Sequence, residues 1–189
     1  MKHLAALLPT ALVVLGGLAS PARATVLYGI GLDGLCDRST VIARGEVISL
    51  APAWQGGRIV TAVTLRVERS LAGGAARGSL VTFYRLGGEV GGIGQRVIGE
   101  PSFQRGEEVL VFLQRRFGRL FVTGMVQGKM RVLPPSAPGG PRRIASALGR
   151  FPLRGGGYAS VAPKTLGELE ARILGRLRAT GRALRGGRR

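Results

Sequence analysis

The chain of 189 residues holds one histidine and one cysteine, and these two residues decide which chemistries are open to it. His3 lies in a leader that we expect to be removed on export, so the mature chain would hold no imidazole. Ser-His-Asp catalysis, Cys-His catalysis and histidine-based zinc sites are then excluded. Cys36 has no partner for a disulfide within the chain, and a thiol without a neighbouring base is a weak nucleophile. We therefore expect an inert Cys36, no enzymatic activity and no cofactor.

Three other patterns could indicate functional sites, but their sequence context argues against each of them. Residues 29–34 spell G-x-G-x-x-G, yet a dinucleotide site needs a strand before the glycines and a full helix after them, and too little chain is available for either. The adjacent Glu107 and Glu108 would point to opposite faces of a strand, so they make a poor acid–base pair. Asp33 and Asp37 can share one helix face, which we interpret as solvated.

The stretch from Leu86 to Gly106 is the strongest candidate for recognition. It carries seven glycines between two predicted strands, and connections of this length are often functional. Glycine lets the backbone approach a partner closely, and exposed apolar side chains in a loop suggest that something covers them. The alternative is a flexible hairpin with bulges. The candidate contact residues are Arg85, Glu89, Val90, Ile93, Gln95, Arg96 and Val97.

A second candidate surface is a basic helix near the C-terminus. Thr165 and Glu168 match the S/T-x-x-E capping box. The apolar positions that follow have the spacing of one helical stripe, and they are Leu166, Leu169, Ile173 and Leu177. The basic positions are Arg172, Arg176, Arg178, Arg182 and Arg185. Such a helix binds anionic lipid or polymer, or it packs on the domain with a solvated basic face. We favour packing, because the stripe is narrow and lacks aromatic anchors.

The chain divides into four regions. Its start reads as a secretory signal peptide, with Lys2, an apolar run and the small-x-small pattern at residues 22–24. The apolar run is shorter than the ~20 residues that a membrane span needs, so we expect cleavage before Thr25 and no transmembrane span afterwards. The expected regions are the signal peptide (1–24), a β-barrel domain (25–133), a Pro/Gly-rich linker (134–163) and a helix with a basic tail (164–189).

Alternation and turn residues predict a mainly β fold. The spacing predicts a short helical turn over residues 32–38 and a long strand over 58–69 that can bend around a small barrel. Residues 109–113 are continuously apolar, so we expect a strand buried on both faces. Further strands are expected over 41–48, 80–84, 120–123 and 128–133, with a loop over 51–57. The predicted fold is a small OB-like closed or partly open β-barrel with a C-terminal amphipathic helix.

These strands resemble netrin-like modules, the OB-type barrels of tissue metalloproteinase inhibitors. Residues 38–47 resemble the family's first strand, 67–73 its second, and 106–113 its Gly-x-x-Tyr-Leu strand. The chain is also similar to exported bacterial proteins with a Gly-Gly-x-x-Gly-Gly loop, here at residues 87–92. The resemblance implies an OB-type fold. It does not carry over the inhibitory mechanism, which uses an N-terminal cysteine where this chain would have Thr25.

The net charge and the expected export bear on which partner the protein binds. The net charge is +18, but it rests on arginine in a Gly/Ala-rich composition typical of GC-rich genomes, so it does not by itself indicate a nucleic-acid partner. We expect a non-enzymatic binding module that is exported to the periplasm or the medium. Its expected partner is a protein, with an extracellular protease as one candidate. The alternative is binding of anionic polymer or a membrane surface through the basic helix and tail.

Overall fold

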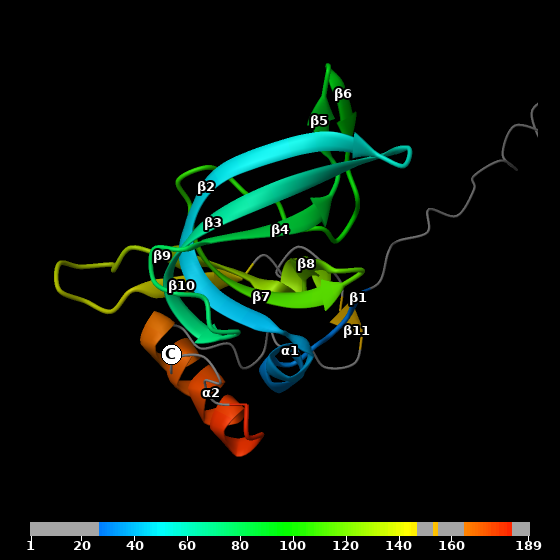
Figure 1. The fold of residues 1–189 in the computed structure, drawn as a ribbon. Coiled ribbons are helices and arrows are strands. Elements are labelled where there is room, and N and C mark those ends of the chain that lie inside the picture. Colours follow the sequence, from blue (N-terminus) through cyan, green and yellow to red (C-terminus); the bar gives the residue numbers. More distant parts are fainter. Residues whose placement is uncertain (1–26, 147–152, 155–164, 183–189) are drawn as a thin grey trace, which may run out of the picture.

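A ring of five strands forms the centre of the protein. The computed structural model describes residues 27–146, 153–154 and 165–182. The strands of the ring are β2 (Val41–Gln55), β3 (Arg58–Ala72), β4 (Leu80–Leu86), β8 (Arg119–Val122) and β7 (Glu108–Arg116), in that order, and β7 pairs again with β2 (Figure 1). Four of the five contacts are antiparallel, whereas β4 and β8 are parallel and meet through one residue pair. The ring is therefore OB-like but is not a regular barrel, which confirms the predicted fold class.

Further elements extend the ring. Strands β9 (Lys129–Leu133) and β10 (Arg143–Ser146) continue the sheet from β7. Strands β5 (Gly88–Val90) and β6 (Ile93–Gln95) form a separate hairpin, and β1 (Leu27–Tyr28) pairs with β11 (Leu153–Arg154). The helices are α1 (Leu32–Arg38), the 3-10 helix η3 (Met125–Gly128) and α2 (Leu166–Ala179). None of the helices in the described part of the chain is long and apolar enough to cross a membrane.

Two hydrophobic cores lie on opposite faces of the central strands. One fills the ring and includes Val63, Phe83 and Val111. The other lies outside the ring, beneath α1 and α2, and includes Ile42 and Phe112. Strand β7 separates them, so alternate residues of its apolar run enter different cores. This explains why residues 109–113 are all buried, as the sequence predicted.

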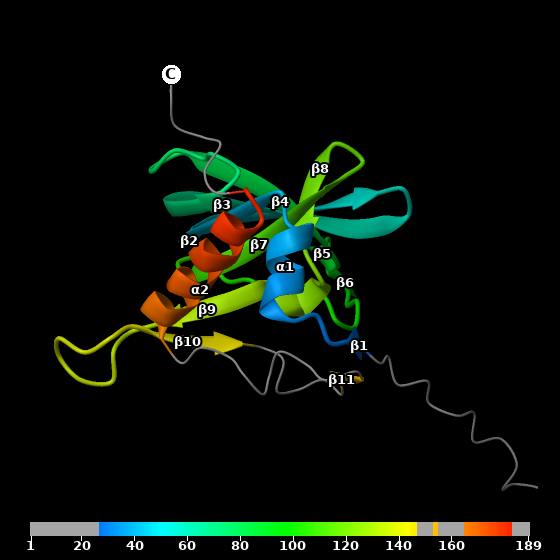
Figure 2. The same cartoon turned by 90° about the horizontal axis from the view of Figure 1, so that it is seen from below.

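Helix α2 packs on the outer face of the sheet beside α1 (Figure 2). Thr165 and Glu168 form the predicted capping box, in which each side chain meets the backbone N–H of the other residue. The predicted stripe is also confirmed, because Leu166, Leu169, Ile173 and Leu177 are all buried in the outer core. Burying one such side chain contributes about 1.5–3 kcal/mol. The helix is therefore an integral part of the domain.

The hairpin of β2 and β3 is longer than the sequence predicted, and the expected loop over residues 51–57 is wrong for most of its length. Strand β2 continues to Gln55, which pairs with Arg58 across a two-residue turn. Gly56 and Gly57 both have positive φ, as such a hairpin turn requires. Pro52 is tolerated because this end of β2 pairs only with β3, and proline fits a strand edge.

Other differences concern segments whose partners are distant in the sequence. Strand β10 lies within the stretch expected as a linker and pairs with β9 from residue 143 onward. The predicted binding loop contains the β5–β6 hairpin.

The helical turn at 32–38 is confirmed, as are the strands expected at 41–48, 58–69, 80–84, 120–123 and 128–133, with shifted ends. The signal peptide, Thr25 and Arg185 lie outside the described residues.

Candidate functional site

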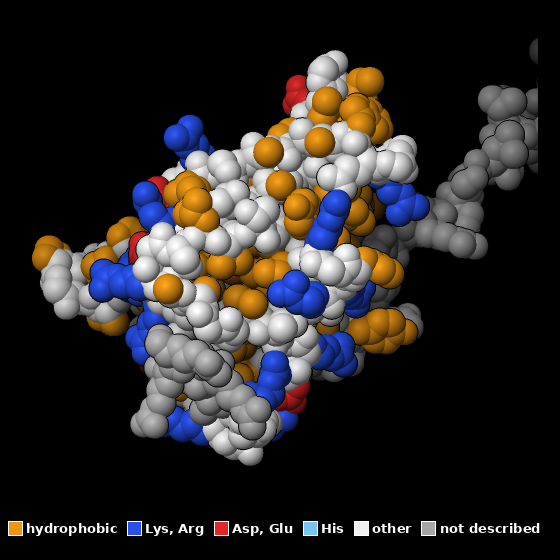
Figure 3. Space-filling model, in the orientation of Figure 1, with side chains coloured by type: hydrophobic (Ala, Val, Ile, Leu, Met, Phe, Trp, Pro, Cys, Tyr) orange, Lys and Arg blue, Asp and Glu red, His pale blue; other side chains and the backbone are white. Residues whose placement is uncertain are grey.

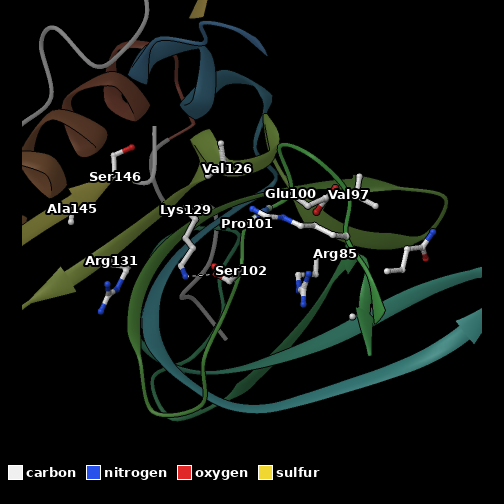
Figure 4. A pocket seen from close by; sticks show the side chains of 13 residues that line it. Arg85, Val97, Glu100, Pro101, Ser102, Val126, Lys129, Arg131, Ala145 and Ser146 are labelled. Carbon is white, nitrogen blue, oxygen red and sulfur yellow. Dashed lines mark hydrogen bonds between the residues drawn. The ribbon is translucent and has the colours of Figure 1, made fainter. Parts of the chain in front are cut away.

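A cavity of about 600 Å³ lies between the predicted loop and the strands β9 and β10 (Figure 4). Its size is within the range of roughly 300–1,000 Å³ typical of small-molecule sites. The lining residues come from β4 to β6, the segment after β6, η3, β9 and β10. They are Arg85, Gly88, Gln95, Arg96, Val97, Glu100, Pro101, Ser102, Val126, Lys129, Arg131, Ala145 and Ser146.

Lys129 forms one wall of the cavity and holds the loop against the sheet. Its Nζ donates to the Ser102 carbonyl oxygen at 2.5 Å and pairs with Glu107 at 2.6 Å. The ammonium also lies 4.4 Å from the centre of the Phe103 ring. Burial lowers the pKa of Lys129, and the negative charge of Glu107 opposes that shift. This lysine is thus committed to internal contacts.

The remainder of the loop is also anchored. Phe103 is buried in the ring, with its ring centre 5.2 Å from that of Phe83. The Gln95 side-chain oxygen accepts a hydrogen bond from the Ile59 N–H at 2.6 Å, and the Gly87 N–H donates to the Ile59 carbonyl at 2.7 Å. The segment from Leu86 to Gly106 is therefore a structured part of the ring, with the β5–β6 hairpin projecting from it.

Arg85 and Glu100 are charged residues with incomplete solvation. The Arg85 Nη1 donates to the Leu86 carbonyl at 3.3 Å, while its Nε is buried without a hydrogen-bond partner in the described structure. Burial lowers the pKa of Arg85, although the charge of Glu100 opposes the shift. Burial raises the pKa of Glu100, and the Leu86 N–H and Arg85 oppose it. Each charge is partly desolvated and only partly compensated by the other.

The structure divides the predicted loop residues between two places. Arg85, Gln95, Arg96 and Val97 line the cavity, whereas Glu89, Val90 and Ile93 lie on the β5–β6 hairpin away from its lining. Sequence reasoning missed Glu100, Lys129 and Arg131. A signal for two of them was present, because Lys129 and Arg131 alternate with Met130 and Val132 and therefore share the face opposite the apolar one.

The β2–β3 hairpin projects from the ring, with the β5–β6 hairpin on one side of it and the β7–β8 turn on the other (Figure 1). Each carries a large exposed apolar side chain: Trp54 beside the β2–β3 turn, Ile93 on β6 and Phe117 in the β7–β8 turn. We call these three residues the hairpin end. Arg119 Nη1 donates to the Gln55 side chain at 2.6 Å and links two of the turns. Figure 3 shows hydrophobic side chains at the tip of the β5–β6 hairpin.

The candidate basic residues of α2 do not form one free surface. The Nε of Arg176 donates to the Asp37 carboxylate at 3.0 Å, and this hydrogen bond lowers the pKa of Asp37. Arg182 donates to the carbonyls of Cys36, Asp37 and Ser39. Arg176 therefore joins α2 to α1, and Arg182 joins the residues after α2 to the end of α1. Arg172 and Arg178 lie on exposed positions of α2.

A cluster of charges joins α2 to the outside of the ring. Arg44 contacts Glu68 and Glu108 at 2.6 Å and Glu170 at 3.2 Å. Glu170 also accepts from Arg69 at 2.6 Å, and Arg142 pairs with Glu108. Burial alone would raise the pKa of Glu108, but hydrogen bonds from Arg142 and Arg44 outweigh it and hold that pKa below its usual value. The cluster has a structural role.

Cys36 is buried in the outer core and suits no chemistry of its own. Burial raises the pKa of the thiol to about 11, with Asp33 and Asp37 adding to the shift. A thiol with this pKa is almost wholly protonated at neutral pH and is a poor nucleophile. Within residues 27–146, 153–154 and 165–182, no three His, Cys, Asp or Glu side chains are grouped so that they could hold a metal ion.

Comparison with known proteins adds no relative. No family model, no curated protein and no solved structure matches the chain. The fold defines the class, an OB-like five-stranded ring with a docked C-terminal helix.

Proposed function

We propose that the chain is an exported, non-enzymatic binding module that recognises a protein partner through its hairpin end. The partner would contact Trp54, Ile93 and Phe117, which are exposed on the β2–β3 hairpin and on the two turns that flank it. Large apolar side chains, and tryptophan in particular, supply much of the energy of protein interfaces when a partner covers them. Small ligands instead favour concave sites, so three protruding side chains suit the surface of another protein.

Phe117 carries this proposal. It occupies the first position of the two-residue turn between β7 and β8, with φ of 49°, and Gly118 follows with φ of 74°. Asn, Asp and Gly are the favoured residues at such a position, because a bulky side chain there is strained. Phe117 is nevertheless fully exposed, so it gains no burial that would offset the strain. A strained and exposed aromatic residue is best explained by a contact outside this chain.

The proposed partner class is an extracellular protein. Export follows from the expected signal peptide, and the resemblance to metalloproteinase inhibitors makes an extracellular protease the first partner to test. Binding would rest on the hairpin end, since no zinc-chelating N-terminal cysteine is expected. Two of the five basic residues of the C-terminal region are held by α1, which makes that region a weaker candidate for recognition.

The test compares the wild-type mature chain with Phe117→Asn as bait for proteins of the source's own culture medium. Asparagine at this position, followed by Gly118, would form a favoured hairpin turn, so the variant should melt at the wild-type temperature or slightly above it. Capture of the partner should fall at least tenfold. Leu80→Ser is the matched control, because Leu80 is also an exposed apolar residue but lies at the start of β4, away from the three turns.

Unchanged capture by Phe117→Asn would overturn the proposed surface. Equal losses for Phe117→Asn and Leu80→Ser would show non-specific hydrophobic capture and would contradict it as well. Titration of the captured protein against both variants gives the affinity ratio directly.

A further inference from the structure

We propose that the cavity between the loop and strands β9 and β10 binds a small organic anion, a molecule with a carboxylate or phosphate head and an apolar body. The site is distinct from the hairpin end, and the proposal does not depend on a protein partner. It rests on the charge balance of the lining, on an unpaired donor of Arg85 and on the apolar residues of the lining.

The charge of the lining favours an anion. Its four cationic side chains come from β4, β9 and the segment after β6, and they are Arg85, Arg96, Lys129 and Arg131. Among the described residues of the lining the only acid is Glu100, and Glu107 stands behind Lys129 and Arg131. Four cations against two carboxylates leave an excess of two positive charges around one concave space, where the low-dielectric walls strengthen their field. Figure 4 shows Arg131 on one side of Lys129 and Arg85 on the other.

Arg85 supplies the second observation. Its Nε is buried and lacks a hydrogen-bond partner among the described residues, and its Nη1 makes only a long hydrogen bond to a neighbouring carbonyl. A buried donor without a partner is unfavourable. A ligand oxygen is the partner that would satisfy this guanidinium after a small rotation of the side chain. Its planar fork matches the two oxygens of a carboxylate or phosphate.

The apolar residues of the lining favour a ligand larger than a simple ion. Val97, Pro101, Val126 and Ala145 provide apolar surface, and the volume of about 600 Å³ far exceeds that of one oxyanion. An aliphatic body attached to the charged head would fill the remaining space and bury this surface. The described lining holds no aromatic side chain, so a flat aromatic ligand would find no ring on which to stack.

Isothermal titration of the full mature chain with five probes tests the proposal. Octanoate and octyl phosphate carry both head and body, inorganic phosphate and acetate carry only a head, and octanamide carries only the body. We expect one saturable site for octanoate, octyl phosphate or both, with at least tenfold weaker binding of the other three. Preference for one amphiphile identifies the head group, and either preference supports the proposal.

Two variants connect the binding to the cavity. Arg131→Gln should weaken binding of the better amphiphile at least fivefold, and Arg85→Met at least tenfold. Arg131 lies on an exposed side of β9, so its replacement should leave the fold intact even if Arg85→Met does not fold. Arg116→Gln, an exposed cation at the end of β7 outside the lining, is the control and should bind as the wild type does.

Three results would overturn the proposal. They are the absence of saturable binding of both amphiphiles, equal binding of octanamide, and unchanged affinity in Arg131→Gln. Phe117→Asn should keep full affinity for the amphiphile, so failure of the hairpin-end proposal and failure of the cavity proposal are separate outcomes.

Discussion

Replacing Glu170 by glutamine should loosen the C-terminal helix and destabilise the whole domain. Glu170 lies on α2, its side chain is only 9% exposed, and its two oxygens accept from Arg44 and Arg69. The helix therefore contributes the only described carboxylate that bridges these two arginines. Glutamine has nearly the same shape but is neutral, so the change removes the charge and leaves the packing of the apolar stripe in place.

The size of the effect follows from the exposure of the two partners. The Arg44 side chain is 16% exposed, and a hydrogen bond to a charged group in such a place contributes about 1.5–3 kcal/mol. The Arg69 side chain is 48% exposed, and pairs of this kind contribute about 0–1 kcal/mol. In Glu170→Gln, Arg44 keeps its contacts with Glu68 and Glu108, and the glutamine oxygen still accepts one hydrogen bond. The free energy of unfolding should therefore fall by about 2 kcal/mol, near the lower end of the combined range. For a chain of this length that corresponds to a Tm lower by about 4–8 °C.

Thermal unfolding and amide hydrogen exchange measure this effect. Glu46→Gln is the control, since Glu46 pairs with Arg66 at a similar distance of 2.6 Å but both side chains are more than one-third exposed. Its Tm should fall by less than about 4 °C, and that smaller difference should vanish in 1 M salt, where the Debye length is about 3 Å. Exchange of the α2 amides should accelerate in Glu170→Gln alone.

Equal losses of Tm in the two variants would contradict this account of Glu170. A lower Tm for Glu170→Gln without faster exchange in α2 would refute it too, because the cluster would then stabilise the ring without docking the helix. A loss that disappears in 1 M salt would show that Glu170 acts as an ordinary surface charge.

Three further predictions concern single residues. The pKa of Glu100 is raised in the folded state, so its ionisation opposes folding once the pH exceeds the ordinary pKa of a glutamate. Glu100→Gln should therefore be more stable than the wild type at pH 7 and equally stable at pH 3. Urea unfolding at both pH values measures the difference. Cys36, with a pKa of about 11, should not react with Ellman's reagent in the native protein at pH 8 but should react fully in guanidinium, and Cys36→Ser should retain binding. A methyl group at Gly45 would lie 2.1 Å from the Arg66 carbonyl oxygen, so Gly45→Ala should cost about 3 kcal/mol or more, whereas Gly94→Ala, which meets open space, should change the free energy of unfolding by less than about 0.5 kcal/mol.

Signals that act over a few residues predicted much of the fold. The capping box and the apolar stripe of α2 specify where the helix begins and which face it buries. The continuous apolar run at residues 109–113 indicated a strand covered on both faces, although it could not show that one cover is the ring interior and the other is a pair of helices. The expected loop over residues 51–57 is instead the end of β2 and a two-residue turn at Gly56 and Gly57, because pairing with β3 extends the strand to Gln55.

Pairings with distant partners were harder to predict. Strand β10 follows a proline-rich stretch, and only its alignment with β9 makes it a strand. The candidate loop could be nominated from its glycines, and Arg85 and Gln95 do line a cavity. The other wall could not be inferred, because alternation places Lys129 and Arg131 on one face of a strand without stating what lies opposite that face.

The distribution of arginines argues against treating the high net charge as one polyanion-binding surface. Arg44 lies in an acidic cluster that holds α2 on the ring, and Arg176 and Arg182 are held by carboxylate and carbonyl oxygens of α1 and the residue that follows it. The cations of the cavity differ, because Arg85 has an unpaired donor and Arg131 reaches its nearest carboxylate only at 3.7 Å. Positive charge that is already paired adds little to the attraction of a ligand, whereas charge without full compensation remains available. Within the described residues, electrostatic recognition is therefore expected at the cavity rather than along the C-terminal helix.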